Sequence, residues 1–189
     1  SLCSPSHRQP PTCRVSMTMV SNKPAAHPPT DAAASKPLLF QLTGIDLEGK
    51  ALGIIGTGRI GSSVARKCVA AFDMKVKGYD PYVSGEVMNS FGVKKVESLD
   101  DLLPSADFLT VHCPLTPETK GMVGRRELAS MKKGTYVINA ARGGIIDEQA
   151  LYEVLCSGHI AGAALDVWEI EPPDPASPLL RHPNLLATP

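Results

Sequence analysis

The 189-residue sequence has no long hydrophobic run and no net charge, and each absence excludes a class of partner. The most prominent apolar segment, 51–55, has the size of one β-strand, whereas a membrane-spanning helix needs about 20 apolar residues. Nineteen basic residues balance nineteen acidic ones, so no excess of positive charge is present to attract nucleic acid or an anionic membrane. We therefore expect neither a nucleic-acid nor a membrane partner.

Paired cysteines are also missing. The five cysteines are odd in number and scattered, and no two of them form a CxxC pair, which predicts neither a disulfide framework nor a metal site. A reducing compartment is the simpler assumption. We expect a cytoplasmic protein, with organelle import through the acid-poor N-terminal segment as the alternative.

Composition divides the chain after residue 37. Residues 1–37 hold seven of the 17 prolines and a single acid, Asp31, and they show no hydrophobic periodicity. Such a segment buries too little apolar surface to offset its ordering entropy, so we predict a disordered tail. Residues 38–189 remain as one domain, which is long enough for a well-formed core.

From residue 38 onward, short apolar strands alternate with helical patterns. Ile60, Val64, Cys68 and Phe72 recur every four residues and mark one face of a helix, and Asp147 is expected to cap another. The predicted strands are 52–55, 75–79, 93–96, 108–111, 136–138, 161–167 and 185–187, and the predicted helices are 60–72, 98–103, 125–132 and 147–155. This alternation predicts an α/β fold, a Rossmann-type doubly wound parallel sheet with helices on both faces.

A glycine-rich motif, GxGxxG at 56–61, follows the first predicted strand and opens a predicted helix. In this context Gly56 permits a tight turn, Gly58 lets the backbone approach a pyrophosphate, and Gly61 allows close packing of helix and strand. The helix N-terminus offers unpaired N–H groups to an anion, and Arg59 can add a charge-assisted contact. The alternative is a glycine turn that binds nothing.

Asp80 comes 19 residues after Gly61, directly after the second predicted strand. A carboxylate at this place accepts hydrogen bonds from the adenosine ribose and repels a 2′-phosphate, which favours NAD over NADP. Because Pro81 follows, Asp80 is also a candidate turn opener. The two roles are compatible, since a turn can present the carboxylate.

Further polar residues follow later strands, where the loops of a parallel sheet line the ligand crevice. His112 ends one strand, although a lone histidine there is more often structural, and Pro114 shapes the loop that follows. Arg142 stands between a strand and two glycines, where its guanidinium can hold a substrate carboxylate by two parallel hydrogen bonds. Asp166 ends another predicted strand and Glu171 follows it, and either acid can simply cap a turn.

These motifs, in this order and spacing, resemble the D-isomer-specific 2-hydroxyacid dehydrogenases over residues 42–189. The matching pieces are GTGRIG at 56–61, GYDPY at 78–82, VHCPLTPETKGMVG at 111–124, NAARGGIIDEQAL at 139–151 and AGAALDVWEIEPP at 161–173. The phosphoglycerate dehydrogenase branch is the nearest within the family, partly because of FGV at 91–93.

The resemblance implies NAD as the cofactor and hydride transfer between NAD(H) and a small 2-hydroxy or 2-oxo acid, with 3-phosphoglycerate as a candidate. It assigns catalysis to Arg142 and Glu171, the latter paired with a histidine that exchanges the hydroxyl proton. It assigns cofactor binding to Gly56, Gly58, Arg59, Ile60, Gly61, Asp80, His112, Pro114, Thr116, Ala140, Arg142 and Asp166. Dimerisation through the cofactor domain is common in the family, so a homodimer is a further expectation.

The sequence departs from the family pattern at that histidine. The family places its catalytic histidine directly after a segment like HPNLLATP, which here ends with Pro189, and His182 matches a loop position. We therefore expect a fragment that binds NAD(H), lacks the substrate lobe and turns over little or no substrate. The alternatives are an NAD-sensing binding module, similar to the corepressor relatives of the family, and another GxGxxG domain of the adenosylhomocysteinase kind.

Overall fold

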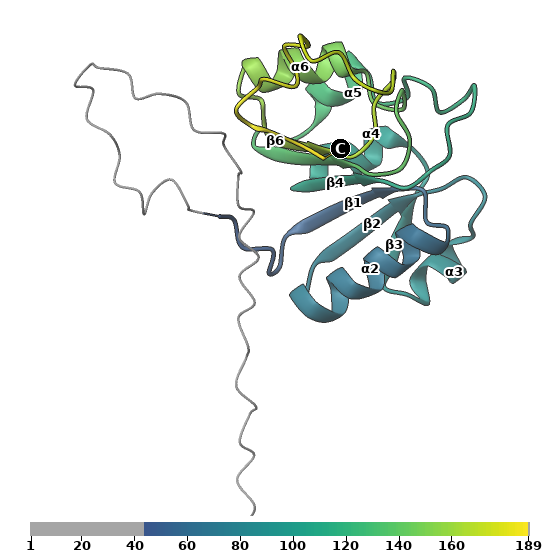
Figure 1. The fold of residues 1–189 in the computed structure, drawn as a ribbon. Coiled ribbons are helices and arrows are strands. Elements are labelled where there is room, and N and C mark those ends of the chain that lie inside the picture. Colours follow the sequence, from purple (N-terminus) through teal and green to yellow (C-terminus); the bar gives the residue numbers. More distant parts are fainter. Residues whose placement is uncertain (1–43, 189) are drawn as a thin grey trace, which may run out of the picture. The chain divides into compact units, whose positions relative to one another are not determined.

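A seven-stranded parallel sheet in the order β3-β2-β1-β4-β5-β6-β7 organises the chain (Figure 1). The structure is a computed structural model that describes residues 44–188, so the tail predicted for residues 1–37 lies outside the described residues. The strands are β1 (Ala51–Ile55), β2 (Lys75–Tyr79), β3 (Val93–Val96), β4 (Phe108–Val111), β5 (Thr135–Asn139), β6 (Ile160–Leu165) and β7 (Leu185–Ala187). The predicted parallel α/β class is confirmed.

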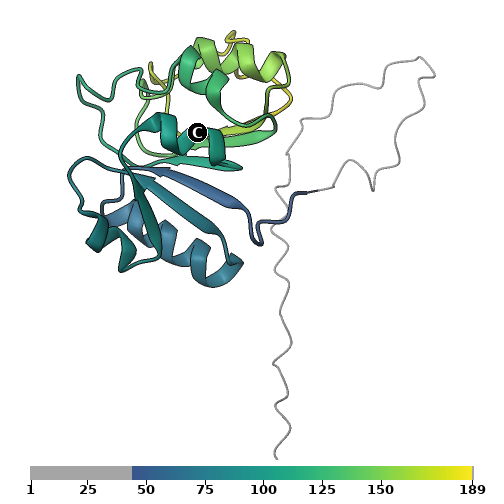
Figure 2. The same ribbon diagram turned by 180° about the vertical axis from the view of Figure 1, so that it is seen from behind.

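Helices lie on both faces of this sheet (Figures 1 and 2). One face carries α2 (Arg59–Phe72) and α3 (Gly85–Asn89), and the other carries α4 (Leu99–Leu102), the 3₁₀ helix η1 (Leu103–Ser105), α5 (Arg125–Ser130) and α6 (Glu148–Cys156). From β1 to β3 the chain moves towards one edge of the sheet, and from β4 to β7 it moves towards the other edge. Because crossovers between parallel strands are right-handed, the two directions place their helices on opposite faces.

Two hydrophobic cores result from the alternation of side chains along each strand. Ile54 packs with Ala65 of α2 on one face, whereas its neighbour Ile55 packs with Leu102 and Leu151 on the other. These side chains are almost inaccessible to water, and Ile54 and Ile55 are 0% and 1% exposed. Strands buried on both faces read as continuous apolar runs, which is why β1 could be recognised in the sequence.

Local signals placed most helix ends correctly. The Asp147 carboxylate accepts a hydrogen bond from the Ala150 N–H at 2.9 Å, so this predicted cap is confirmed. The helix predicted over 98–103 ends at Leu102 and continues as the 3₁₀ turn η1, because Pro104 has no N–H for an α-helical bond. Helix α3 was not predicted, because its single turn is too short to show periodicity.

Candidate functional site

The sheet changes direction between β1 and β4, and the loops after these two strands are in contact there. The His112 N–H donates to the Ile55 carbonyl at 2.7 Å. A Cβ atom on Gly56 would lie 2.7 Å from the Cys113 nitrogen, and Gly56 has a φ of +87°. Only glycine fits this position on both counts. Open α/β sheets bind their ligands at this topological switch point. Here the backbone of Gly56 packs directly against the backbone of the loop after β4.

The other two motif glycines have different surroundings. A Cβ on Gly61 would lie 2.1 Å from the Gly56 carbonyl oxygen, so the first turn of α2 packs directly against the loop. Around Gly58 no heavy atom lies within 4 Å of the corresponding position. Gly58 is thus not required by protein packing, and its exposed backbone is open to a ligand.

The N-terminus of α2 is left electrostatically uncompensated. Gly58 is its N-cap and provides no side-chain hydrogen bond, and the first turn contains no acidic residue. Within residues 44–188 the Arg59 guanidinium forms no ion pair, and Ile60 beside it is 67% exposed. This helix of 14 residues begins with free N–H groups next to a cation, an arrangement that suits a diphosphate. The exposed apolar side chain of Ile60 suits a planar, partly apolar group attached to that diphosphate.

Asp80 lies at the end of β2 and points at the glycine loop. Its Oδ2 accepts a hydrogen bond from the Thr57 N–H at 2.8 Å, and its Oδ1 accepts one from the Tyr82 N–H at 3.0 Å. Asp80 is only 9% exposed. An ionised carboxylate has about four lone-pair sites, so capacity for a ribose hydroxyl remains. The turn role of Asp80 is present in the structure, and it fixes the carboxylate beside the loop.

Thr57 is a residue that the sequence motifs did not single out. Its hydroxyl also donates to Asp80 Oδ2, at 3.3 Å, and Thr57 is 3% exposed. Its methyl group fills the space above Gly78, where a Cβ would come within 2.8 Å of it. Thr57 therefore holds the Asp80 carboxylate beside the glycine loop, although the two residues are 23 positions apart in the sequence. No local pattern in the motif reveals this contact.

His112 and Cys113 follow β4 at the same mouth. The His112 Nε2 lies 3.0 Å from the Thr110 hydroxyl, and the ring is half-buried. Burial lowers the pKa of the His112 imidazole below its ordinary value of 6.5. Burial also raises the pKa of the Cys113 thiol. Both shifts favour the uncharged side chain at pH 7, so neither residue adds charge to this wall of the site.

The lowered pKa of His112 predicts a dependence of stability on pH. Well above pH 6.5 the imidazole is neutral in the folded and the unfolded chain alike. As the pH falls below 6.5, the unfolded chain takes up the proton first, so the free energy of unfolding decreases until the lower pKa of the folded state is reached. Urea unfolding at pH 7.5, 6.5 and 5.5 measures this loss, and we expect His112→Gln to show a smaller loss. An equal loss in the variant would contradict the assignment to His112.

The remaining residues of this loop hold its shape. Pro114 is exposed, and its carbonyl accepts a hydrogen bond from the Thr119 hydroxyl at 2.7 Å. Thr116 donates its N–H to the same Thr119 hydroxyl at 2.8 Å, while the two hydroxyls lie 3.3 Å apart. The predicted cofactor residue Thr116 is therefore part of a closed turn at the carboxyl end of β4.

Arg142 lies in a turn after β5 that a buried asparagine organises. The Asn139 side chain donates to the Arg142 carbonyl at 2.9 Å and accepts from the Ala141 N–H at 3.1 Å. The guanidinium itself is exposed and touches only the Ala141 carbonyl among the described residues, at 2.6 Å. The turn thus presents a cation whose remaining donors are free for an anionic ligand.

The loop after β6 carries the two predicted acids. Glu171 accepts a hydrogen bond from the Trp168 N–H at 3.1 Å, so it caps its own turn, and Asp166 accepts one from the Thr188 hydroxyl. The Asp166 N–H donates to the Asn139 carbonyl at 3.0 Å, which joins the loops after β5 and β6. Within residues 44–188 no hydrogen bond or ion pair links Glu171 to Arg142.

A small cavity of 80 Å³ lies at the carboxyl ends of β5, β6 and β7. It is lined by the predicted residues Ala140 and Asp166 together with Ile138, Ala164 and Leu186. The structure thus gathers the predicted site residues at one edge of the sheet, after β1, β2, β4, β5 and β6. Their roles in binding and catalysis stay predictions.

Neither a cluster of metal ligands nor a membrane-spanning helix is present in residues 44–188. Residues 44–188 contain no group of three or more histidine, cysteine or acidic side chains placed to hold a metal ion. None of the helices in this part of the chain has the length and apolar character needed to cross a membrane.

A parallel sheet with a glycine-lined mouth at its switch point, a free helix N-terminus and an acid at the end of the second strand defines a dinucleotide-binding domain. Residues 32–189 match the family model described as "D-isomer specific 2-hydroxyacid dehydrogenase, NAD binding domain", and the chain belongs to this family. The family predicted from the sequence motifs is confirmed.

Individual relatives agree with this assignment. The D-3-phosphoglycerate dehydrogenase of Methanocaldococcus jannaschii is 51% identical over 146 residues, which are 77% of this chain and 28% of that protein. The crystal structure of the TT0316 protein from Thermus thermophilus is 41% identical with a TM-score of 0.72, over 82% of this chain and 47% of that one. A D-isomer specific 2-hydroxyacid dehydrogenase from Xanthobacter autotrophicus Py2, in complex with NADPH and MES, is 37% identical with a TM-score of 0.66, over 74% and 44% of the two chains. The chain therefore spans about a quarter to a half of the length of these relatives.

Proposed function

We propose that this chain is the coenzyme-binding domain of an NAD-dependent dehydrogenase acting on D-2-hydroxy acids, and that it binds NADH in preference to NADPH. The observation that carries the proposal is the joint geometry of Gly58 and Asp80. Gly58 leaves the start of α2 open, and Asp80 is held by Thr57 beside that opening. A buried carboxylate at this place favours two ribose hydroxyls and repels a phosphate.

The residues of this chain divide the work of holding the coenzyme. The N–H groups at the start of α2 and the Arg59 guanidinium would bind the diphosphate, and Asp80 would accept hydrogen bonds from the adenosine ribose. The neutral loop at His112 and the surfaces of Ala140 and Asp166 would flank the nicotinamide. When bound, NAD(H) accepts or supplies the hydride in the reaction.

Arg142 would position the substrate. Its exposed guanidinium follows β5 at the same edge of the sheet and can hold a carboxylate and polarise the adjacent carbonyl. Glu171 would pair with the histidine that transfers the hydroxyl proton, as in the family pattern. The 51% identity to an archaeal D-3-phosphoglycerate dehydrogenase supports 3-phosphoglycerate as the first substrate to test.

Among the described histidines none is hydrogen-bonded to Glu171. His112 contacts Thr110, and His182 accepts a hydrogen bond from the Asn184 N–H at 3.2 Å. We therefore propose that a polypeptide of these 189 residues binds NADH without turning over 2-hydroxy acids at a normal rate. A steady-state assay with 3-phosphoglycerate, lactate and glycerate tests this, and a normal turnover number with any of them would contradict it.

Gly58→Val separates coenzyme binding from folding. The new side chain meets no protein atom within 4 Å at its Cβ but projects toward the proposed diphosphate, so we expect NADH to bind at least about tenfold more weakly. The loss of a glycine N-cap costs only about 1 kcal/mol of stability. Calorimetric titration with NADH and thermal unfolding measure the two effects.

Gly85→Ala is the matched control, since Gly85 begins another helix and its Cβ would make only ordinary contacts at 3.8 Å with Lys95. This variant should bind NADH like the original chain. Unchanged NADH binding by Gly58→Val, or equal loss in Gly85→Ala, would count against the proposed coenzyme site.

A further inference from the structure

A cavity of 490 Å³ lies away from the coenzyme loops. It is lined by residues at the amino ends of β1 and β2, together with Lys94 of β3 and Leu102 of α4. Because the strands are parallel, these amino ends lie at the sheet edge opposite to residues 56–61. Its volume is in the range of small-molecule sites, about 300–1,000 Å³.

Three lysines line this cavity from a single face of the sheet, and we refer to it as the lysine cavity after Lys75, Lys77 and Lys94. Lys77 and Lys94 are directly opposite each other in the β2–β3 pairing. Lys75 precedes Lys77 by two residues, so its side chain leaves the same face of β2. Like charges that face each other across a strand pair are destabilising, which an anion between them would relieve.

Lys77 is the most constrained of the three cations. It is half-buried, and its ammonium group donates a hydrogen bond to the neutral Ser105 hydroxyl at 2.9 Å. Within residues 44–188, none of the three lysines forms an ion pair with a carboxylate. A partly desolvated ammonium without an anionic partner carries an electrostatic cost, and a bound anion would offset it.

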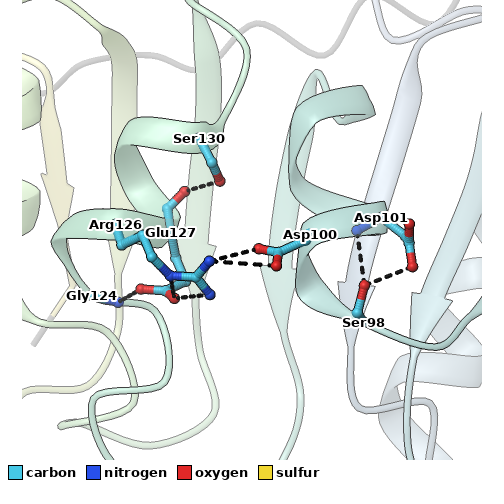
Figure 3. Close-up of polar contacts among 7 residues, drawn as sticks. All are labelled: Ser98, Asp100, Asp101, Gly124, Arg126, Glu127 and Ser130. Atoms are coloured by element: carbon cyan, nitrogen blue, oxygen red, sulfur yellow. Dashed lines mark hydrogen bonds and ion pairs between the residues drawn. The ribbon is translucent and has the colours of Figure 1, made fainter.

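Three acids close in sequence to lining residues have other partners. Asp107, which precedes β4, accepts hydrogen bonds from Lys132 at 2.6 Å and from the Ala51 N–H at 2.9 Å. The two acids of α4 are also engaged, because Asp100 pairs with Arg126 at 3.1 Å and Asp101 accepts a hydrogen bond from the Ser98 hydroxyl at 2.6 Å (Figure 3). These three acids therefore do not neutralise the lysines of the cavity.

The rest of the lining is mostly apolar. Among the described residues the three lysines are the only charged side chains of the wall, to which seven apolar residues contribute: Ala51, Leu52, Val69, Met74, Val76, Leu102 and Ala106. Such a lining suits a hydrocarbon body, while the ammonium groups suit a carboxylate head. Concavity favours a small molecule over an extended peptide, which would need a long open groove.

We propose that the lysine cavity binds an amphipathic monocarboxylate, a straight-chain acid of medium length, with its carboxylate between Lys77 and Lys94 and its chain against Ala51 and Val69, which are the half-buried apolar residues of the lining. This site is independent of the coenzyme site, with which it shares no residue.

Titration of the full chain with sodium octanoate, followed by amide chemical shifts, tests the proposal. We expect saturable changes at residues 51–53, 75–77 and 102–106 and none at residues 56–61. Neutral octanol should bind at least about tenfold more weakly, since the charge-assisted hydrogen bonds are lost. Changes that do not saturate, that centre elsewhere, or that are equal for octanol and octanoate would overturn the proposal.

Variants at the lysines provide a second readout. Lys77→Met keeps the apolar stem and removes the charge, so octanoate should bind about tenfold more weakly. The more exposed Lys94→Met should weaken binding as well, and it carries the test if Lys77→Met does not fold. Lys67→Met, at an exposed position of α2 outside the cavity, is the matched control and should leave the affinity unchanged. Unchanged affinity in both cavity variants would also overturn the proposal.

Discussion

Replacing Gly143 by alanine is expected to cost about 3 kcal/mol of stability and to lower Tm by about 10 °C. A Cβ at this position would lie 1.8 Å from the Trp168 carbonyl oxygen and 2.7 Å from the Glu169 nitrogen. Both atoms belong to the backbone, so no side-chain rotation can relieve the overlap. The loops after β5 and β6 must then move apart, and they carry Arg142 and Glu171 respectively. Thermal unfolding measures the effect.

Gly85→Ala again serves as the control, because alanine suits the start of α3 and should leave Tm unchanged or slightly higher. Because Gly143 does not have a positive φ, alanine is not excluded there by backbone conformation. The difference in Tm between the two variants therefore tests the close approach of Gly143 to the Trp168 backbone. A Gly143→Ala chain that unfolds at the original temperature would show that the two loops are not in contact.

Asp80→Asn is expected to weaken NADH binding by about tenfold to a hundredfold while NADPH binding is retained or improved. The substitution keeps the shape of the side chain but removes the charge that attracts ribose hydroxyls and repels a 2′-phosphate. An amide has one acceptor oxygen, so either the Thr57 or the Tyr82 N–H loses its partner. We expect a stability loss of about 1–3 kcal/mol from that unpaired group.

Calorimetric titration with both coenzymes, together with thermal unfolding, separates these effects. Asp101→Asn removes the same charge from an exposed position in the first turn of α4 and should leave the preference for NADH unchanged. If Asp80→Asn lowers Tm but keeps the ratio of the NADH and NADPH dissociation constants, Asp80 serves only the turn and the coenzyme assignment fails.

The sequence predicted helices and strands correctly where their pattern lies within a short stretch of the chain. The four-residue recurrence from Ile60 to Phe72 corresponds to α2, and Asp147 caps α6 as expected. The one-turn helix at Gly85–Asn89 was missed because five residues carry too little periodicity. The strand predicted over 161–167 runs from Ile160 to Leu165 in the structure.

The candidate site was readable only in part. The glycines of the motif and the acid at residue 80 have fixed spacing along the chain, so they could be found without coordinates. The partners that orient them could not. Thr57 bonds to Asp80 across 23 residues, and Asn139 organises the Arg142 turn only because its side chain is buried after β5.

By itself the sequence determined the parallel α/β class, the position of the glycine loop and the family, because periodicity, glycine spacing and motif order are properties of short stretches of chain. Only the tertiary structure decided that Gly143 meets Trp168, that Thr57 holds Asp80, and that Lys77 and Lys94 face each other at the opposite edge. Such contacts depend on the order of strands in the sheet, which places residues far apart in the chain side by side.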